Sequence, residues 1–321
     1  MNTYLKEWFY IIENMSNDNT YKLAWGRALI ELVSMIDDVK AENKIQFYDI
    51  AENMLKYYWN QTFFFNLKQG PNVLKKPIIL QETEKCIEAF KLSNQSNIPV
   101  WFDYAKVEVL SKQKTYKVSV NRIAKTLKTD VSWRFMIANG KEYKLYQLDR
   151  DNMCVTFTKQ AVLQIKEYAF VLSQLLNYRW AQLLEQFNNA PRIANKVKGI
   201  SNSKLQRNSL TKYKNLLLEY FDIDNPIDFY TGELLEKNDI SIDHVIPWSF
   251  MYSDDIWNLV ITSRRNNSSK NNNLPSKEDI KRLEKRNKEL VAEMKEVNYK
   301  RELEMAIKND YVNKFYMAMR L

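Results

Sequence analysis

The first 95 residues carry apolar side chains at intervals of three and four, the spacing that places them on one face of an α-helix. One stripe follows an Asn-Asp-Asn-Thr sequence suited to a helix start and comprises Tyr21, Trp25, Leu29, Leu32 and Ile36. A second stripe comprises Phe47, Ile50, Met54 and Tyr58. After a break at Gln69-Gly70-Pro71, a further helix is expected over residues 82–92. This region is therefore predicted to be a set of amphipathic helices.

The middle of the chain mixes helix and strand patterns. A short helix is predicted at residues 120–127, followed by strands at 133–137 and 143–148 around an Asn139-Gly140 pair, which is the strongest short-range signal for a β-hairpin. The polar side chains in and before this helix that are available to DNA are Lys117, Asn121, Arg122 and Lys125. The helix before it is too poorly defined to predict a helix-turn-helix.

A third strand is expected at residues 154–157, and a long helix at residues 159–187. The apolar side of that helix comprises Val162, Ile165, Ala169, Leu172, Leu176, Trp180 and Leu183. These patterns predict an α+β fold that is predominantly α, with a helical N-terminal region that carries a small β-hairpin.

The segment from residue 228 to residue 275 has a different pattern. It indicates a strand, a turn, a second strand ending at Asp243-His244, a loop, and a helix beginning around Asn258. The tail from residue 276 to residue 321 has a helical pattern with interleaved charges. A small ββα unit flanked by helices is therefore expected in the C-terminal part.

A basic stretch without any acid runs from residue 188 to residue 218 and contains Pro191 and Gly199. We expect the domain junction here, which gives a domain of residues 1–190, a basic linker and helix at 191–225, and a domain of residues 226–321. The stretch is either a solvated linker or an arm that contacts phosphates. The candidates for nucleic-acid contact are Arg192, Lys196, Lys198, Lys204 and Arg207.

Composition narrows the class of protein. Hydrophobic residues make up 45% and charged residues 27%, which excludes a disordered chain and a membrane protein. The net charge of +9 favours a polyanionic partner such as nucleic acid. The two cysteines, Cys86 and Cys154, lie far apart, which argues against a disulfide framework and a cysteine-ligated zinc site. With no signal-peptide pattern at the N-terminus, we expect a cytoplasmic protein.

Three residues near the C-terminal strand have the chemistry of a hydrolytic site. His244 is the only histidine of the chain, and an imidazole can accept a proton from water near neutral pH. Asp243 supplies a carboxylate oxygen and Asn267 an amide oxygen, the kinds of ligand that Mg²⁺ and Mn²⁺ prefer. One base and one metal ion would suffice to hydrolyse a phosphodiester bond.

These residues resemble the HNH (ββα-metal) endonuclease family, and in detail the HNH domains of type II CRISPR effector nucleases and related stand-alone endonucleases. The matching elements are Tyr230-Thr-Gly-Glu, Asp243-His244-Val-Ile-Pro, Asn258, and Asn267-x-x-Lys270 with a following Leu-Pro. The resemblance implies that His244 is the general base and that Asp243 and Asn267 bind the metal. It also implies that Asn258 braces the loop presenting His244 and that Lys270 contacts substrate phosphate.

The sequence departs from the family pattern in two places. Asn267 stands where many members have histidine, and Tyr230-Thr-Gly232 stands where many have the first cysteine pair of a structural zinc site. The unit must then be held by packing of Phe229, Leu234, Ile242, Val245 and Trp257. Asp254 and Asp255 precede Asn258, where helix capping or an outer contact to the metal is expected.

The sequence therefore predicts a DNA endonuclease that uses Mg²⁺ or Mn²⁺, with an N-terminal region that selects DNA or a partner. By analogy, restriction or antiphage defence is the expected setting. An RNA-cleaving or partner-activated nuclease remains an alternative, as does a catalytically silent nucleic-acid-binding protein that uses the HNH unit as a scaffold. A homodimer or an activating protein partner is compatible with the sequence, and no membrane association is expected.

Overall fold

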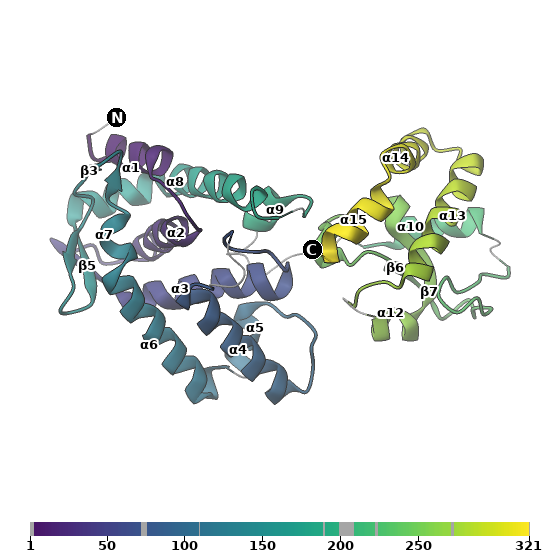
Figure 1. Ribbon diagram of the computed structural model, residues 1–321, viewed down its shortest axis with the longest axis horizontal. Helices are drawn as coiled ribbons and strands as arrows, with labels where there is room; N and C mark the ends of the chain where they lie inside the picture. The colour runs from purple at the N-terminus through teal and green to yellow at the C-terminus, as the bar shows by residue number, and fades with distance from the viewer. Residues whose placement is uncertain are drawn as a thin grey trace. The chain divides into compact units, whose positions relative to one another are not determined.

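The computed structural model describes residues 3–71, 76–108, 110–188, 190–198, 209–221, 224–270 and 273–320. The chain forms two compact units (Figure 1). Unit 1 consists of residues 1–188 and 193–204, and unit 2 consists of residues 189–192 and 205–321. The described residues are mostly helical with small antiparallel sheets, which confirms the predicted α+β, predominantly α class.

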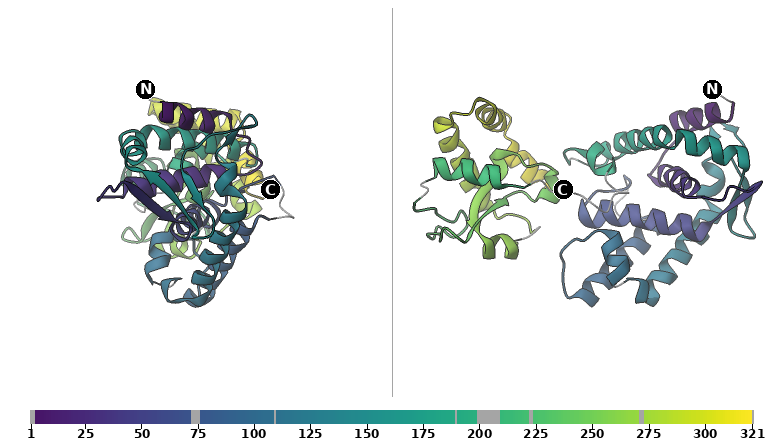
Figure 2. Two further views of the ribbon diagram at one scale, coloured as in Figure 1. Left: turned by 90° about the vertical axis from the view of Figure 1, so that its left-hand side faces the viewer. Right: turned by 180° about the vertical axis from the view of Figure 1, so that it is seen from behind.

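Unit 1 is built from helices around a core rich in aromatic residues. Its helices are α1 (Thr3–Asn14), α2 (Tyr21–Ser34), α3 (Phe47–Trp59), α4 (Ile78–Asn94), α5 (Phe102–Glu108), α6 (Lys114–Thr129), α7 (Val131–Arg134), α8 (Lys159–Glu185) and α9 (Ile193–Lys198), with a π-helix at Asn60–Phe64 and a 3₁₀-helix at Leu110–Lys112. The long helix α8 packs against α2 (Figure 2). Its first turn is capped by Thr158, whose hydroxyl accepts a hydrogen bond from the Ala161 amide at 3.2 Å.

Two small sheets complete unit 1. Strands β1 (Glu42–Gln46), β5 (Cys154–Thr158) and β4 (Gln147–Asp149) form an antiparallel sheet in the order β1-β5-β4. Strands β2 (Ile137–Ala138) and β3 (Lys141–Glu142) form the predicted hairpin. Asn139 and Gly140 both have left-handed backbones, with φ of 49° and 74°, as this two-residue turn requires.

The strand predictions around that hairpin were too long. Residues 131–134 form helix α7, and β4 pairs with β5 instead of extending the hairpin. Helix α6 begins at Lys114, six residues before the predicted start at Val120. The sequence does not reveal this first turn, because the turn buries only Tyr116 and shows little apolar periodicity.

Unit 2 has its own core around one hairpin-like sheet. Strands β6 (Ile240–His244) and β7 (Leu259–Ser263) pair antiparallel, with Asp243 opposite Val260 and His244 opposite Leu259. The other elements are α10 (Thr211–Tyr220), α11 (Trp248–Met251), a 3₁₀-helix at Ile256–Asn258, α12 (Arg264–Lys270), α13 (Lys277–Glu293), α14 (Val297–Lys308) and α15 (Tyr311–Arg320). β6, β7 and α12 are the ββα unit.

The prediction that a helix begins around Asn258 is wrong. Residues 259–263 form strand β7, and the helix of the ββα unit begins only at Arg264. All five residues of β7 are buried, as expected for a short strand covered on both faces. The second of the two predicted strands, which ends at Asp243-His244, is β6. The first predicted strand, ahead of the turn, is reduced to an isolated bridge between Ile227 and Leu234.

The packing predicted for this unit is confirmed except at one position. Ile242, Val245 and Trp257 are buried in the core, and Phe229 packs against it. Leu234 is 68% exposed, because the bridge with Ile227 turns it outward and buries Leu235 instead.

Cys86 on helix α4 and Cys154 on strand β5 are buried and free. The helices that the structure describes include none that is both long and apolar enough to traverse a bilayer.

Candidate active site

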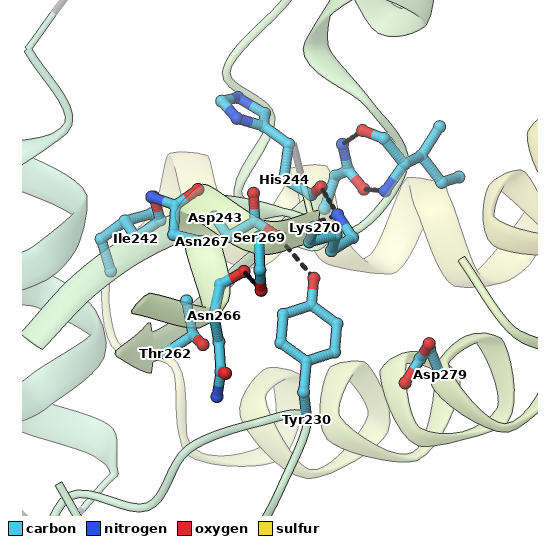
Figure 3. A network of polar contacts seen from close by, with 12 residues as sticks. Tyr230, Ile242, Asp243, His244, Thr262, Asn266, Asn267, Ser269, Lys270 and Asp279 are labelled. Carbon is cyan, nitrogen blue, oxygen red and sulfur yellow. Dashed lines mark hydrogen bonds and ion pairs between the residues drawn. The ribbon is translucent and has the colours of Figure 1, made fainter. Parts of the chain in front are cut away.

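The functional side chains lie where strand β6 ends against helix α12. Asp243 and His244 are the last two residues of β6, so their side chains leave the strand on opposite faces. Figure 3 shows the His244 ring and the Tyr230 ring on opposite sides of this strand. Asn267 and Lys270 are three residues apart on α12, which places them on one helix face, and both contact β6.

Asp243 is a buried carboxylate whose negative charge is matched by a cation. Its Oδ2 accepts hydrogen bonds from the Tyr230 hydroxyl at 2.5 Å and from the Lys270 ammonium at 2.8 Å. Lys270 also donates to the His244 carbonyl oxygen at 2.6 Å. The Oδ2 atom of Asp243 therefore binds a positively charged group.

The pKa values of the two partners reflect this burial. Burial raises the pKa of the Tyr230 hydroxyl well above its ordinary value, and the charge of Asp243 raises it further. Burial also lowers the pKa of Lys270, while the charge and hydrogen bond of Asp243 act in the opposite direction. Tyr230 therefore stays a hydrogen-bond donor at neutral pH.

Asn267 is held by its amide nitrogen. Nδ2 donates to the Ser241 hydroxyl at 2.7 Å and to the Ile242 carbonyl oxygen at 3.2 Å. Figure 3 shows the Asn267 side chain beside Ile242, to which its amide nitrogen is bound. These bonds fix Asn267 against strand β6, which also carries Asp243.

This donor set fits a Mg²⁺ or Mn²⁺ ion that keeps several water or substrate oxygens. Among the described ranges, no three His, Cys, Asp or Glu residues cluster as a closed metal site would require. Asp243 and Asn267 would supply the protein oxygens, and Asp243 already stabilises a positive charge from Lys270.

His244 has a carboxylate partner that sequence reasoning assigned elsewhere. Its Nε2 lies 3.0 Å from Asp254 Oδ1, and both side chains are largely buried. An ionised Asp254 only accepts, so it fixes the proton on Nε2 and leaves Nδ1 as the basic nitrogen.

Helix capping by the two aspartates is not observed. Asp255 precedes the 3₁₀-helix but makes no side-chain cap, and instead pairs with Arg192 at 3.1 Å and accepts from the Ser253 hydroxyl. Only the position of Asp254 in the loop between β6 and β7 signals its role, because that loop must return to the end of β6.

Asn258 fastens the loop that follows His244. Its Oδ1 accepts from the Ile246 amide and its Nδ2 donates to the Ile246 carbonyl oxygen, both at 2.8 Å. Its own carbonyl oxygen accepts from the Val245 amide at 3.0 Å. The three bonds fix the backbone directly after His244, where a bracing residue is expected.

Asp228 is a second buried carboxylate that the sequence did not single out. Oδ2 accepts from the Ser263 amide at 2.7 Å, the Thr262 hydroxyl at 2.8 Å and Asn266 Nδ2 at 2.9 Å. Oδ1 accepts from the amides of Tyr230 and Thr231. Burial alone raises the pKa of Asp228, but these hydrogen bonds outweigh it and the pKa is lower than usual. Asp228 joins the loop that carries Tyr230 to β7 and α12, in a segment without zinc-binding cysteines.

The candidate nucleic-acid contacts of the basic stretch that the structure describes have different surroundings. Arg192 is bound to Asp255, and Lys196 is buried with its ammonium 5.9 Å from the centre of the Phe65 ring. Lys196 has no exposed surface, which does not fit the predicted contact with a phosphate. Lys198 ends helix α9, and Lys204 and Arg207 lie outside the described residues.

Comparison with known proteins gives matches over part of the chain. Residues 228–276 match the family model described as HNH endonuclease. A stretch of 87 residues is 34% identical to the CRISPR-associated endonuclease Cas9 of Streptococcus mutans serotype c, and covers 26% of this chain and 6% of that protein. A stretch of 72 residues is 35% identical to the CRISPR-associated endonuclease Cas9 of Listeria innocua serovar 6a, and covers 22% of this chain and 5% of that protein. No solved structure matches.

The chain thus spans about one twentieth of the length of these relatives. The matched segment contains Asp243, His244, Asn258, Asn267 and Lys270, and it carries the HNH likeness predicted from the sequence, which is confirmed. The family match supports a nuclease in general.

Proposed function

We propose that this chain is a metal-dependent endonuclease that hydrolyses phosphodiester bonds in DNA. One observation carries the proposal: His244, bound to the Asp254 carboxylate, directly follows Asp243 at the end of β6, and Asn267 is hydrogen-bonded to the same strand. A base and a pair of hard oxygen donors are the parts that phosphodiester hydrolysis requires.

His244 acts as the general base. Because Asp254 holds the proton on Nε2, the lone pair of Nδ1 accepts the proton of the attacking water. The imidazolium that forms is stabilised by the Asp254 carboxylate at 3.0 Å. Asn258 keeps the backbone after His244 fixed, so the ring does not have to be ordered again in each turnover.

Asp243 and Asn267 would hold a Mg²⁺ or Mn²⁺ ion through their side-chain oxygens. When bound, the ion stabilises the negative charge that develops on the phosphate and on the leaving oxygen. Lys270 adds a second positive charge beside Asp243 and contacts the substrate phosphate. Tyr230 keeps Asp243 oriented by its hydrogen bond to Oδ2.

We further propose that the enzyme acts in the cytoplasm in restriction or antiviral defence, with unit 1 selecting the DNA or a partner. The similarity to CRISPR-associated endonucleases supports this setting, although it extends over only the HNH segment.

The test is cleavage of supercoiled plasmid by the purified chain with Mg²⁺ or Mn²⁺ and with EDTA. We expect nicked or linear product only with metal, and at least a 10³-fold slower reaction for Asp243→Asn, since hydrolysis without the metal ligand loses roughly 4 kcal/mol of transition-state stabilisation. The matched control is Asp38→Asn, an exposed aspartate of unit 1, which should cleave normally. Equal cleavage by wild type and Asp243→Asn, or cleavage of RNA alone, would contradict the proposal.

A further inference from the structure

Helix α6 of unit 1 presents a solvent face with only positive charge. Its buried side comprises Tyr116, Ser119, Val120, Ile123, Ala124 and Leu127. Four lysines lie on the opposite side, separated along the chain by three, eight and three residues, and Asn121 lies between the second and the third. These spacings place all four on one helix face. We call this set the α6 stripe, and it consists of Lys114, Lys117, Lys125 and Lys128.

Among the described residues, no carboxylate pairs with a lysine of the α6 stripe. Four of the five acids on the neighbouring helices α3 and α4 are bound to other cations, in the pairs Glu52–Lys106, Glu82–Lys85, Glu82–Arg122, Glu84–Lys76 and Glu88–Lys91, and the fifth, Asp49, has no ion pair among the described residues. Asp130, at the end of α6, is bound to Arg134. The neighbouring acids are thus arranged so that the positive charge of the stripe remains.

The first half of the α6 stripe works against the helix that carries it, whereas Lys128 lies in the last turn, where the helix dipole favours a cation. The first turn of α6 contains Lys114 and Lys117 and no acid, although the positive end of the helix dipole favours acids there. The spacing of three residues between Lys114 and Lys117, and between Lys125 and Lys128, places like charges next to each other. Helix stability therefore gives no reason for Lys114 and Lys117 in the first turn, whereas an anionic partner does.

We propose that the α6 stripe binds the phosphate backbone of DNA, which gives unit 1 a substrate-binding surface. This inference rests on the proposed function, because it takes the partner to be the substrate of that site. The four lysines extend over about 21 Å of helix, long enough to contact several phosphates along one strand. Lysine is a point charge on a flexible stem, so the stripe holds DNA without reading its sequence.

The decisive measurement is the salt dependence of DNA binding by the full chain in EDTA, where cleavage is absent. A fluorescent duplex of about 20 base pairs is titrated with wild type, with the quadruple lysine-to-glutamine variant of the α6 stripe, and with a control. The control changes four exposed lysines elsewhere in unit 1 to glutamine, namely Lys6, Lys44, Lys141 and Lys159. It removes the same charge from the chain.

We expect the stripe variant to bind at least tenfold more weakly at about 0.1 M salt, and its slope of log K against log salt to fall by roughly 3. The control should stay within about threefold of wild type. Equal losses of affinity in the stripe variant and the control would overturn the proposal, since net charge alone would then explain binding. A salt slope of the stripe variant equal to that of wild type would overturn it as well.

Two further readings separate misfolding and failure of the proposed function. The stripe variant should melt at the wild-type temperature or above, because like charges have been removed, and a quadruple lysine-to-arginine variant should regain binding. If the arginine variant is folded yet does not bind, the proposal fails. If wild type binds through the stripe but never cleaves, the proposed hydrolysis is wrong and the binding surface stands.

Discussion

At the scale of single residues, the site depends on contacts between side chains distant in sequence. His244 and Asp254 are ten residues apart, and Asp228 reaches Ser263 across 35 residues. Each of these bonds joins a loop to the end of a strand. The reactive His244 therefore lies on a strand, and its partner Asp254 lies in a loop, a division that is common in enzyme sites.

Asp254→Asn should slow cleavage by about 10²-fold or more, because the amide no longer stabilises the imidazolium and can hold the wrong tautomer. Single-turnover cleavage rates with saturating metal provide the measurement. Asp255→Asn is the matched control, because the neighbouring Asp255 contacts Arg192 and Ser253 but not His244. An Asp254→Asn rate no lower than that of Asp255→Asn would remove Asp254 from the mechanism.

Asp228→Asn should destabilise unit 2 by about 2–4 kcal/mol, since an amide cannot accept all the hydrogen bonds that the buried carboxylate receives. Urea unfolding at neutral pH measures the difference, with the exposed Asp224→Asn as control. Because hydrogen bonding lowers the pKa of Asp228, its stabilisation is present above the unfolded-state pKa of about 4 and is lost as pH falls below it. The difference between wild type and variant should therefore shrink in acid, and a constant difference would contradict this account.

How far the site could be predicted differs between residues. Asp243, His244, Asn258 and Asn267 were found because their residue types and spacing occur together in one segment. Tyr230 belongs to a matching element of the family resemblance and stands where many members have a cysteine pair, but its bond to Asp243 cannot be read from the sequence. Lys196 was expected at a nucleic acid but is buried, because charge alone does not say which side of a helix faces inward.

At the scale of elements, the order of β6, loop, β7 and α12 sets the site, and here the prediction was only partly right. The sequence pattern predicts the start of a helix over Leu259–Ser263, but these five residues form strand β7. So short a run has no distinguishing periodicity, and its pairing with β6, which lies fifteen residues earlier in sequence, decides the structure. Long segments such as α8 were predicted well, because many turns share one apolar side.

Helix α14 supplies a pH-sensitive contact to the site loop. Glu302 accepts from the Ile256 amide at 2.6 Å, directly before Trp257 and Asn258. Burial raises the pKa of Glu302 to about 7, and the charge of Asp255 adds to this, against the lowering effect of the Ile256 and Trp257 amides. The folded state therefore keeps a proton that the unfolded chain releases at lower pH.

Stability should accordingly fall as pH rises from about 4.5 to 7, and Glu302→Gln should remove this loss while keeping the hydrogen bond. At pH 8 we expect the variant to be more stable by about 1 kcal/mol, a value reduced for the partial exposure of the side chain. At pH 4 the two proteins should unfold alike. Urea unfolding at both values is the check, and a variant that is no more stable at pH 8 would refute the pKa assignment.

At the scale of the whole molecule, the chain consists of two compact units, of which only the second contains the matched HNH segment. The sequence indicated where the composition changes, because the basic stretch without acids stands out. It could not indicate the topology of unit 1, where the packing of helices depends on contacts between distant segments. The role of unit 1 therefore rests on its surface chemistry.

Because each unit has its own core, we expect two transitions in scanning calorimetry of the full chain. Asp228→Asn should lower the midpoint of one transition by several degrees and leave the other in place. If both transitions shift together, the units unfold as one and the separate description is wrong.

The central claim is that His244 is the base of a nuclease site, and imidazole rescue tests it most directly. His244→Ala should cleave plasmid at least 10²-fold more slowly than wild type. Added imidazole should raise the cleavage rate of this variant at least tenfold, because it can enter the space of the missing ring. Asp243→Asn should gain nothing from imidazole. If His244→Ala cleaves at the wild-type rate, with or without imidazole, the account is contradicted.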